Sequence, residues 1–581
     1  MNIPVSRYFA LLARYLKPQW RKVAVLALLL GSSIALQLYN PQIIRRFLDT
    51  ATAGGGSGSL PGLALLFMAL AVINQLVTVL SRYVSEQVSW TATNELRADL
   101  AAHCLRLDLS FHKSRTAGEM VERVDGDVTA LSNFFSQMVV DLLGNLLLMI
   151  GVLALLFRED WRAGLALTGF VLATLWVLGV IQRRSVPYHA AHRQAMAELA
   201  GTIGETLAGT EAIRSSGAAG YAMRRFYRAL QGWARAGVRS GMAMGFMWGS
   251  SVFIFTAGTA LALAIGAWLY TAGAATAGTV YLIFHYTELL RRPLEQIRTQ
   301  MQDLQKAGAS IGRVEELTRT ASRIQDGPGR PVPAGPLSVE LRGVGFEYDP
   351  GDPVLQGIDL RLAPGEVLGL LGRTGSGKST LARLLLRFYD PTGGAVILGG
   401  TDLREAKLKE LRRRVGFVTQ DVQLFAATVR ENLTFFDPSI PDGQIVAVLE
   451  ELGLGPWLAA LPHGLDTLIE SGGGGLSAGE AQLLAFARVF LADPGLVIMD
   501  EASSRLDPAT EALVERAVTR LLAGRTGIII AHRLATVQRA DSILILEGGQ
   551  VLEYGARERL AADPNSRFAH LLRTGIEEVL A

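Results

Sequence analysis

Six long apolar stretches occupy the first half of the chain, and no other feature limits its fold as strongly. They are residues 23–38, 63–80, 142–157, 163–181, 246–269 and 279–290. Most of them reach or approach the roughly 20 residues with which an α-helix crosses ~30 Å of hydrocarbon. Buried helices of a soluble protein are the alternative, but several runs are longer than a globular helix requires. We therefore predict an all-α transmembrane domain with six spans.

The connections between the stretches alternate between short and long. The first and second stretches are joined by the polar segment DTATAGGGSGS, and the third and fourth by RED. The long connections, after the second and fourth stretches, carry helical patterns rich in Ala, Leu, Arg and Glu. We expect these helices to continue into the cytosol and turn back near 110–120 and 213–226.

The sequence predicts four consecutive regions. Residues 1–19 mix aromatic and basic side chains, which is typical of an interfacial "elbow" helix and not of a cleavable signal. Residues 20–320 form the transmembrane domain, and the Pro/Gly-rich stretch 326–336 marks a linker over 321–336. Residues 337–581 alternate strand-like and helical segments, which predicts an α/β domain.

Basic residues near the apolar stretches favour a cytosolic N-terminus and α/β domain. Those on the predicted cytosolic side are Lys17, Arg21, Lys22, Arg82, Arg183 and Arg184. Those on the opposite side, which weaken the assignment, are Arg45, Arg46 and Arg158. The balance of basic residues on the two sides therefore predicts a multi-pass membrane protein whose α/β domain lies in the cytosol.

A glycine-rich loop in the α/β half matches the P-loop pattern G-x-x-x-x-G-K-[ST]. It follows the strand-like run VLGLL and precedes the helical run STLARLLLRF. In this pattern backbone N–H groups converge on phosphates, the lysine reaches the outer phosphates and the hydroxyl holds Mg²⁺. A glycine-rich turn without a ligand is the alternative, which the surrounding strand, lysine and helix argue against. The candidate residues are Gly372, Arg373, Thr374, Gly375, Ser376, Gly377, Lys378, Ser379 and Thr380.

Two further strand-like runs end in residues that suit phosphate chemistry. LVIMDE ends in Asp500, which can reach the Mg²⁺ shell, and Glu501, which is placed to polarise an attacking water. TGIIIAHR ends in His532, which can contact a γ-phosphate. A lone histidine at a strand end is more often structural, but the order of these motifs favours a functional role. Between the P-loop and His532, the segment LSAGE at 476–480 begins another apolar helix.

The ordered motifs resemble those of ATP-binding cassette exporters of the half-transporter type, which fuse six spans to one nucleotide-binding domain. The motifs are FEYD, GRTGSGKST, VTQD, LSAGE, LVIMDE, SSRLD and AHRLAT, and the resemblance covers nearly the whole chain. It implies ATP and Mg²⁺ as cofactors, with Tyr348 stacking on adenine and Gln420 joining Ser379 and Asp500 at the metal. Two such domains meet head to tail in this family, so Ser477 and Gly479 would contact an ATP bound by a second chain.

Two departures from the family pattern lie on the side that serves this second chain. The usual LSGGQ is LSAGE here, and the preceding T-x-V-G-E-R-G is TLIESGG. Ala478 adds a methyl group, and Glu480 places a negative charge near phosphates. The residues supplied to the chain's own ATP look intact, so the resemblance favours a heterodimer with a second half-transporter over a homodimer in which this variation is harmless.

The resemblance implies ATP-driven export or flipping of an amphipathic or lipophilic compound, lipid or peptide by alternating access. The alternative is an ATP-gated channel or regulatory half-subunit, although a possible catalytic base, Glu501, argues for hydrolysis. Four polar residues of the last span should face a cavity or one another: His285, Glu288, Arg291 and Arg292. Glu288 and Arg292 are spaced to pair, and the alternative is that the arginines mark the membrane boundary. A single cysteine, Cys104, excludes an intrachain disulfide, and a net charge of +3 gives no sign of nucleic-acid binding.

Overall fold

The computed structural model describes residues 13–53, 58–133, 139–470, 472–500, 508–531 and 537–574. The chain forms two compact units. One, here called the helical unit, contains 1–105 and 116–320, and the other, the α/β unit, contains 106–115 and 321–581. The first predicted turn therefore belongs partly to the α/β unit, since residues 106–115 pack with that part of the chain.

Long helices build the helical unit, as the apolar stretches predict. They are α2 (Trp20–Thr52), α3 (Leu60–Arg106), α7 (Val139–Glu159), α8 (Trp161–Ala208), α10 (Ala219–Thr271) and α11 (Ala277–Arg319). Within the described residues, five of these are long and apolar enough to cross a membrane, and α11 is not among the five. Glu288 interrupts the apolar stretch of α11, and Arg291 and Arg292 follow it directly, which makes α11 the most polar of the six.

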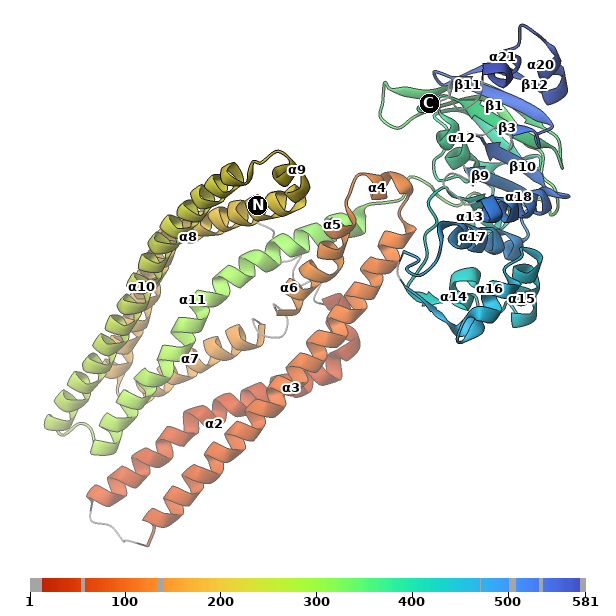
Figure 1. The fold of residues 1–581 in the computed structure, drawn as a ribbon. Coiled ribbons are helices and arrows are strands. Elements are labelled where there is room, and N and C mark those ends of the chain that lie inside the picture. Colours follow the sequence, from red (N-terminus) through yellow and green to blue (C-terminus); the bar gives the residue numbers. More distant parts are fainter. Residues whose placement is uncertain are drawn as a thin grey trace. The chain divides into compact units, whose positions relative to one another are not determined.

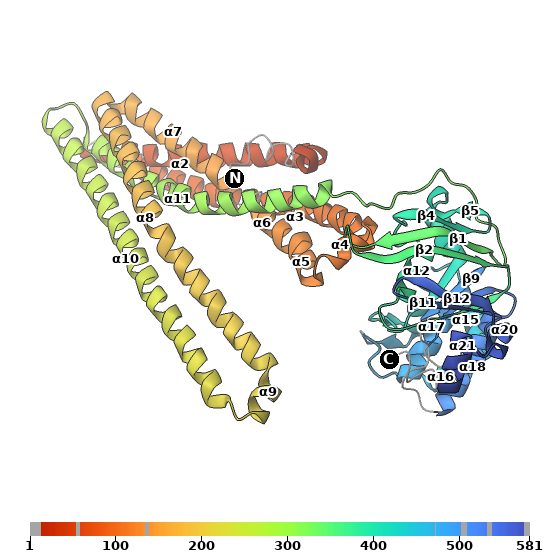
Figure 2. The same ribbon diagram turned by 90° about the horizontal axis from the view of Figure 1, so that it is seen from above.

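Several of these helices are much longer than a membrane is thick. With 48 and 53 residues, α8 and α10 extend roughly 70–80 Å at ~1.5 Å per residue, against ~30 Å of hydrocarbon. They lie side by side and meet at the short helix α9 (Thr210–Ser215) (Figure 1 and Figure 2). The predicted second turn at 213–226 is thus realised as the tip of a helical hairpin.

The predicted elbow helix falls mostly on residues 1–12, which are outside the described part of the chain. Its last residues are helical and continue through the 3₁₀ turn η1 (Lys17–Gln19) into α2. Tyr15 donates a hydrogen bond of 2.9 Å to Asp99 on α3. This contact fixes the start of the first long helix to the second.

The core of the helical unit lies where α7, α8, α10 and α11 pack together. Leu156, Leu167 and Tyr286 are fully buried there. Other apolar side chains point outward, and Trp176, Trp248 and Phe253 expose more than 70% of their surface. An apolar face of this kind is costly in water and suits contact with lipid.

Two sheets form the framework of the α/β unit. One is antiparallel, in the order β2 (Pro353–Leu362), β1 (Val339–Glu347), β4 (Gly393–Leu398) and β5 (Thr401–Asp402). The other has the order β12 (Gln550–Ala556), β11 (Ser542–Glu547), β3 (Val367–Gly372), β10 (Thr526–Ile530), β9 (Leu496–Asp500) and β6 (Val415–Val418). Its strands from β11 to β6 are parallel. Every residue of β3 and β10 is buried, as expected for parallel strands covered on both faces.

The longer helices of the α/β unit are α12 (Lys378–Leu385), α15 (Asp442–Glu451), α17 (Ala478–Ala492) and α18 (Pro508–Leu522). Among them, α12 contacts β3 and α17 contacts β6 of the parallel sheet. The remaining short elements of both units are α4 (Leu109–Lys113), α5 (Ala117–Val121), η2 (Glu122–Gly126), α6 (Asp127–Asn133), η4 (Leu403–Glu405), α13 (Leu408–Arg414), β7 (Ala427–Thr428), α14 (Val429–Thr434), α16 (Gly455–Ala460), η5 (Gly464–Asp466), β8 (Leu468–Ile469), α20 (Arg557–Ala562) and α21 (Arg567–Thr574).

Candidate nucleotide-binding site

The parallel strands bring the predicted motifs to one edge of the sheet. Strands β3, β9 and β6 all run the same way and end at Gly372, Asp500 and Val418. Between β3 and β9 lies β10, whose last residue, Ile530, pairs in register with Asp500. The P-loop, Asp500 and the segment after β6 therefore lie along the same edge. Glu501 and His532, which follow β9 and β10 in sequence, lie outside the described residues.

The backbone of the P-loop requires its glycines. Gly375 and Gly377 have φ values of +84° and +104°, a region that side chains rarely adopt. A Cβ at Gly377 would also lie 2.5 Å from Cδ2 of Leu355. Helix α12 begins immediately afterwards at Lys378, so the loop delivers the N-terminus of this helix to the sheet edge.

Two buried polar groups point to an anionic ligand in the loop. The Lys378 side chain is 6% exposed, and Nζ donates to the carbonyl oxygens of Gly372 at 2.5 Å and Arg373 at 3.0 Å. The Ser376 hydroxyl is buried and has no hydrogen-bond partner among the residues that the structure describes. Because buried polar groups are almost always satisfied in native proteins, a phosphate oxygen is the partner that this loop fits. Thr374 lies between these residues at the turn of the loop.

A hydroxyl and a carboxylate meet beside the loop. Ser379, in the first turn of α12, donates from Oγ to Oδ2 of Asp500 at 3.4 Å. Oxygen ligands of this kind are those that Mg²⁺ prefers. Gln420 is exposed and follows β6 by two residues, which places it at the same sheet edge.

Tyr348 lies beside α12, where hydrogen bonds to its hydroxyl and aromatic contacts to its ring hold the side chain in place. The hydroxyl is 3.1 Å from the Thr380 hydroxyl and accepts a hydrogen bond of 3.1 Å from Arg383. Its ring packs edge to face against Phe346, with centroids 4.9 Å apart, and against Tyr389 at 5.3 Å. Ring and hydroxyl are thus fixed next to the helix that begins at the P-loop.

The LSAGE segment forms the start of α17, as predicted, and shows an arrangement that we did not predict. Ser477 is the N-cap, and its Oγ accepts from the Glu480 backbone N–H at 3.2 Å. The Glu480 carboxylate accepts in return from the Ser477 N–H at 2.7 Å. Gly479 is buried in the same turn. The signal S-x-x-E was readable in the sequence as a capping box.

Polar side chains on α11 make contacts that differ from the expected pair. Glu288 accepts a hydrogen bond of 2.7 Å from the Thr259 hydroxyl on α10. Arg291 forms an ion pair of 3.6 Å with Glu295, four residues later. The structure describes the side chains of Glu288 and Arg292, and the two do not form an ion pair with each other.

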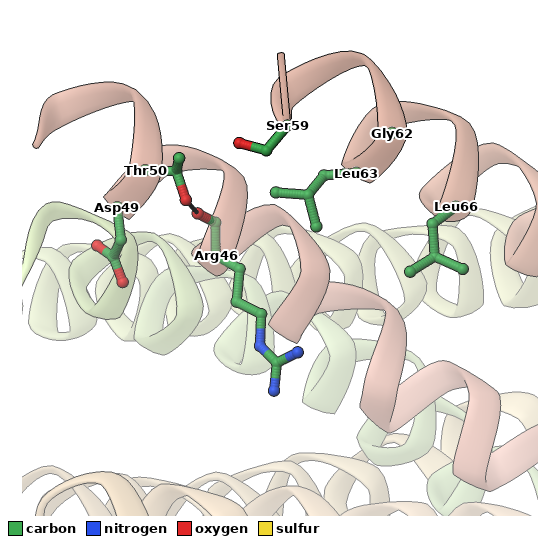
Figure 3. A pocket seen from close by; sticks show the side chains of 7 residues that line it. All are labelled: Arg46, Asp49, Thr50, Ser59, Gly62, Leu63 and Leu66. Carbon is green, nitrogen blue, oxygen red and sulfur yellow. Dashed lines mark hydrogen bonds between the residues drawn. The ribbon is translucent and has the colours of Figure 1, made fainter. Parts of the chain in front are cut away.

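A cavity of about 540 Å³ opens between α2 and α3, near the connection that joins them. Figure 3 shows its lining: Arg46, Asp49 and Thr50 from α2, Ser59 from the turn before α3, and Gly62, Leu63 and Leu66 from α3. Asp49 also accepts a hydrogen bond of 2.9 Å from the Gly278 N–H at the start of α11. The cavity therefore offers apolar and charged contacts together.

Comparison with known proteins relates both units to transporters. Residues 23–294 match the ABC transporter transmembrane region, and residues 355–504 match the ABC transporter ATP-binding family model. The chain is similar in fold to a bacterial Atm1-family ABC exporter with ATP bound, with a TM-score of 0.79, 26% identity and coverage of 95% of this chain and 98% of that one.

Curated relatives are named as a flippase, a fatty acid transporter and a multidrug efflux protein. An ATP-dependent lipid A-core flippase of Thiobacillus denitrificans is 31% identical over 579 residues, which cover 98% of this chain and 99% of the flippase. A fatty acid ABC transporter of Mycobacterium bovis is 33% identical, covering 80% of this chain and 74% of its own length. A multidrug efflux protein of Mycobacterium bovis is 33% identical over 95% of this chain but only 46% of its own length. The chain belongs to the ATP-binding cassette exporters, as a multi-pass membrane half-transporter that couples ATP hydrolysis to transport.

Proposed function

We propose that this chain exports or flips an amphipathic, lipophilic molecule, most simply a lipid or fatty acid, out of the cytosolic leaflet of a bacterial inner membrane. The contacts on α10 and α11 carry the proposal. Glu288, held by Thr259, and Arg291, stacked 5.4 Å from Phe255, place charge beside aromatic surface. Such a mixture suits a molecule with a charged head and an apolar body. The relatives named for lipid A-core and fatty acids support this substrate class.

We assign the nucleotide chemistry to residues along the sheet edge. The P-loop residues 372–380 bind the phosphates, with Lys378 on the outer ones and Tyr348 stacked on the base. Ser379, Asp500 and Gln420 hold Mg²⁺, which neutralises phosphate charge when bound. The 3.4 Å contact between Ser379 and Asp500 supports a shared metal ligand set.

We assign the remaining steps to residues that the sequence alone identifies. Glu501 polarises the attacking water, and His532 contacts the γ-phosphate. Ser477 and Gly479 complete the site of a second half-transporter chain when two α/β units close. Closure then depends on ATP, because ATP binds the closed state more tightly than the open one.

For the assembly, we favour a heterodimer, because both departures from the family pattern lie in segments that serve the partner's ATP. A homodimer is the alternative. Native mass of the purified complex separates the two, since a transport-competent assembly of two identical chains contradicts the heterodimer. The N-terminus and the α/β unit are assigned to the cytosol from the basic residues flanking the spans.

The test of transport uses inside-out membrane vesicles containing the full complex. We expect ATP-dependent accumulation of a fluorescent long-chain fatty acid or phospholipid, with Glu501→Gln abolishing both accumulation and ATP hydrolysis while preserving ATP binding. A Lys409→Met variant, altered on an exposed surface, is the matched control. ATP binding and channel-like substrate flux that persist in Glu501→Gln would instead support the ATP-gated alternative.

A further inference from the structure

The ring of Tyr348 has a buried side and an outer side. Its two aromatic neighbours, Phe346 and Tyr389, are 5% and 6% exposed, and both belong to the hydrophobic core of the α/β unit. Together with the hydrogen bonds to Thr380 and Arg383, they fix the ring from within. A nucleotide base arriving from solvent therefore has to use the outer side.

That outer side is already covered by a cation. The Lys113 ammonium, at the end of α4, lies over the Tyr348 ring with Nζ 4.3 Å from the centroid. Lys113 is an exposed residue, so its ammonium reaches the ring from solvent. A cation at this distance from a ring face is held by the ring quadrupole.

Asp108 fixes the position of Lys113, because its hydrogen bonds attach α4 to the rest of the α/β unit. Oδ1 of Asp108 caps α4 by accepting from the N–H groups of Ser110 at 2.9 Å and Phe111 at 3.2 Å. Oδ2 accepts from the Arg323 N–H at 2.6 Å. Leu109 packs against the same core as Tyr348. The segment 106–115 and Tyr348 belong to one compact unit.

We propose that Lys113 and the nucleotide base compete for the outer face of Tyr348. Lys113 then sets the affinity of the site for the base and leaves the ring when a nucleotide binds. The proposal rests on the assigned role of Tyr348 in the proposed function and extends it to a second residue.

The test measures equilibrium ATP binding by calorimetry, with the full-length protein in lipid nanodiscs and EDTA present to prevent hydrolysis. Lys113→Met removes the cation but keeps a long side chain, and it should bind ATP about two- to five-fold more tightly. Lys113→Arg should not gain affinity, because it keeps a cation over the ring. Lys409→Met, which removes an exposed charge elsewhere, should bind as the parent does.

Two further measurements separate the base from the phosphates. Inorganic tripolyphosphate lacks a base, so its affinity should stay unchanged in Lys113→Met. In a Tyr348→Ala background, Lys113→Met should have no effect on ATP. Weaker binding of both ATP and tripolyphosphate in Lys113→Met would show that the lysine attracts phosphates, and would overturn the competition.

The outcome also distinguishes this proposal from the one on which it rests. Unchanged ATP affinity in Lys113→Met, together with weaker binding in Tyr348→Ala, overturns the competition alone. Unchanged affinity in Tyr348→Ala overturns the base-contacting role of Tyr348 and the competition with it.

Discussion

Replacing Glu480 with alanine should loosen the first turn of α17, whereas replacing it with glutamine should not. In the structure the Glu480 carboxylate accepts from the Ser477 N–H at 2.7 Å, which is one half of the capping box. A capping interaction at an exposed helix start is worth about 1 kcal/mol. That loss corresponds to a roughly five-fold increase in local opening. Glutamine keeps an acceptor oxygen at the same place, so Glu480→Gln should open as the parent does.

The assay is hydrogen exchange of the peptide that covers the start of α17, measured on the full-length protein, together with ATP turnover. We expect faster exchange and lower turnover in Glu480→Ala, because the turn that presents Ser477 and Gly479 loses its fixed conformation. Glu480→Gln should remain within about two-fold of the parent in both measurements. A several-fold change in turnover in Glu480→Gln with unchanged exchange would refute the reasoning, since the charge and not the cap would then be decisive.

Three other changes test positions outside this turn. Gly377→Ala forces an alanine into φ +104° against Leu355 and should weaken ATP binding more than about ten-fold in a binding titration. Asp127→Asn removes the charge that holds Arg313, whose Nε lies 2.9 Å from Oδ2 of Asp127. Because the arginine side chain is half exposed, we expect the free energy of unfolding to fall by only ~2 kcal/mol and the melting temperature by a few degrees. Burial raises the pKa of Asp108, but hydrogen bonds from Arg323 and from the α4 backbone outweigh it and lower the pKa overall. Its stabilising contribution is therefore full above the ordinary aspartate pKa of ~3.9 and is lost only as pH falls through the lowered value. The protection of α4 against hydrogen exchange, measured relative to the intrinsic exchange rate at each pH, should therefore be constant from pH 8 to about pH 5.

The general fold was predictable because it depends on local periodicity. Apolar runs of membrane-spanning length became α2, α3, α7, α8 and α10, and the alternation after 337 became strands and helices. The assignment of 106–115 to the α/β unit could not be predicted in this way. It depends on contacts such as that of Asp108 with Arg323, which lie 215 residues apart in sequence. No local pattern encodes such a contact.

The candidate site likewise combines features that local sequence patterns predict with features that depend on long-range contacts. Gly372, Asp500 and Val418 end parallel strands, so their shared edge follows from strand patterns and the rule for parallel sheets. The contact of Lys113 with Tyr348 does not, because it requires the fold to bring α4 to the ring. Glu480 is an intermediate case. Its spacing from Ser477 matches the capping-box pattern. From the sequence, however, we considered only the negative charge that it places near the expected phosphates.

The capping box also changes what the variant signature implies. The family's LSGGQ has the same spacing, Ser-x-x-Gln, and glutamine can accept from the serine N–H as glutamate does. The presence of Glu480 where the family has glutamine therefore preserves the turn. A serine hydroxyl has one donor and two acceptor positions, so Ser477 Oγ can accept from the Glu480 N–H and still donate to a partner's phosphate. It follows that LSAGE remains compatible with a working site in the partner, and that the heterodimer has to be decided by native mass and not by the charge of Glu480.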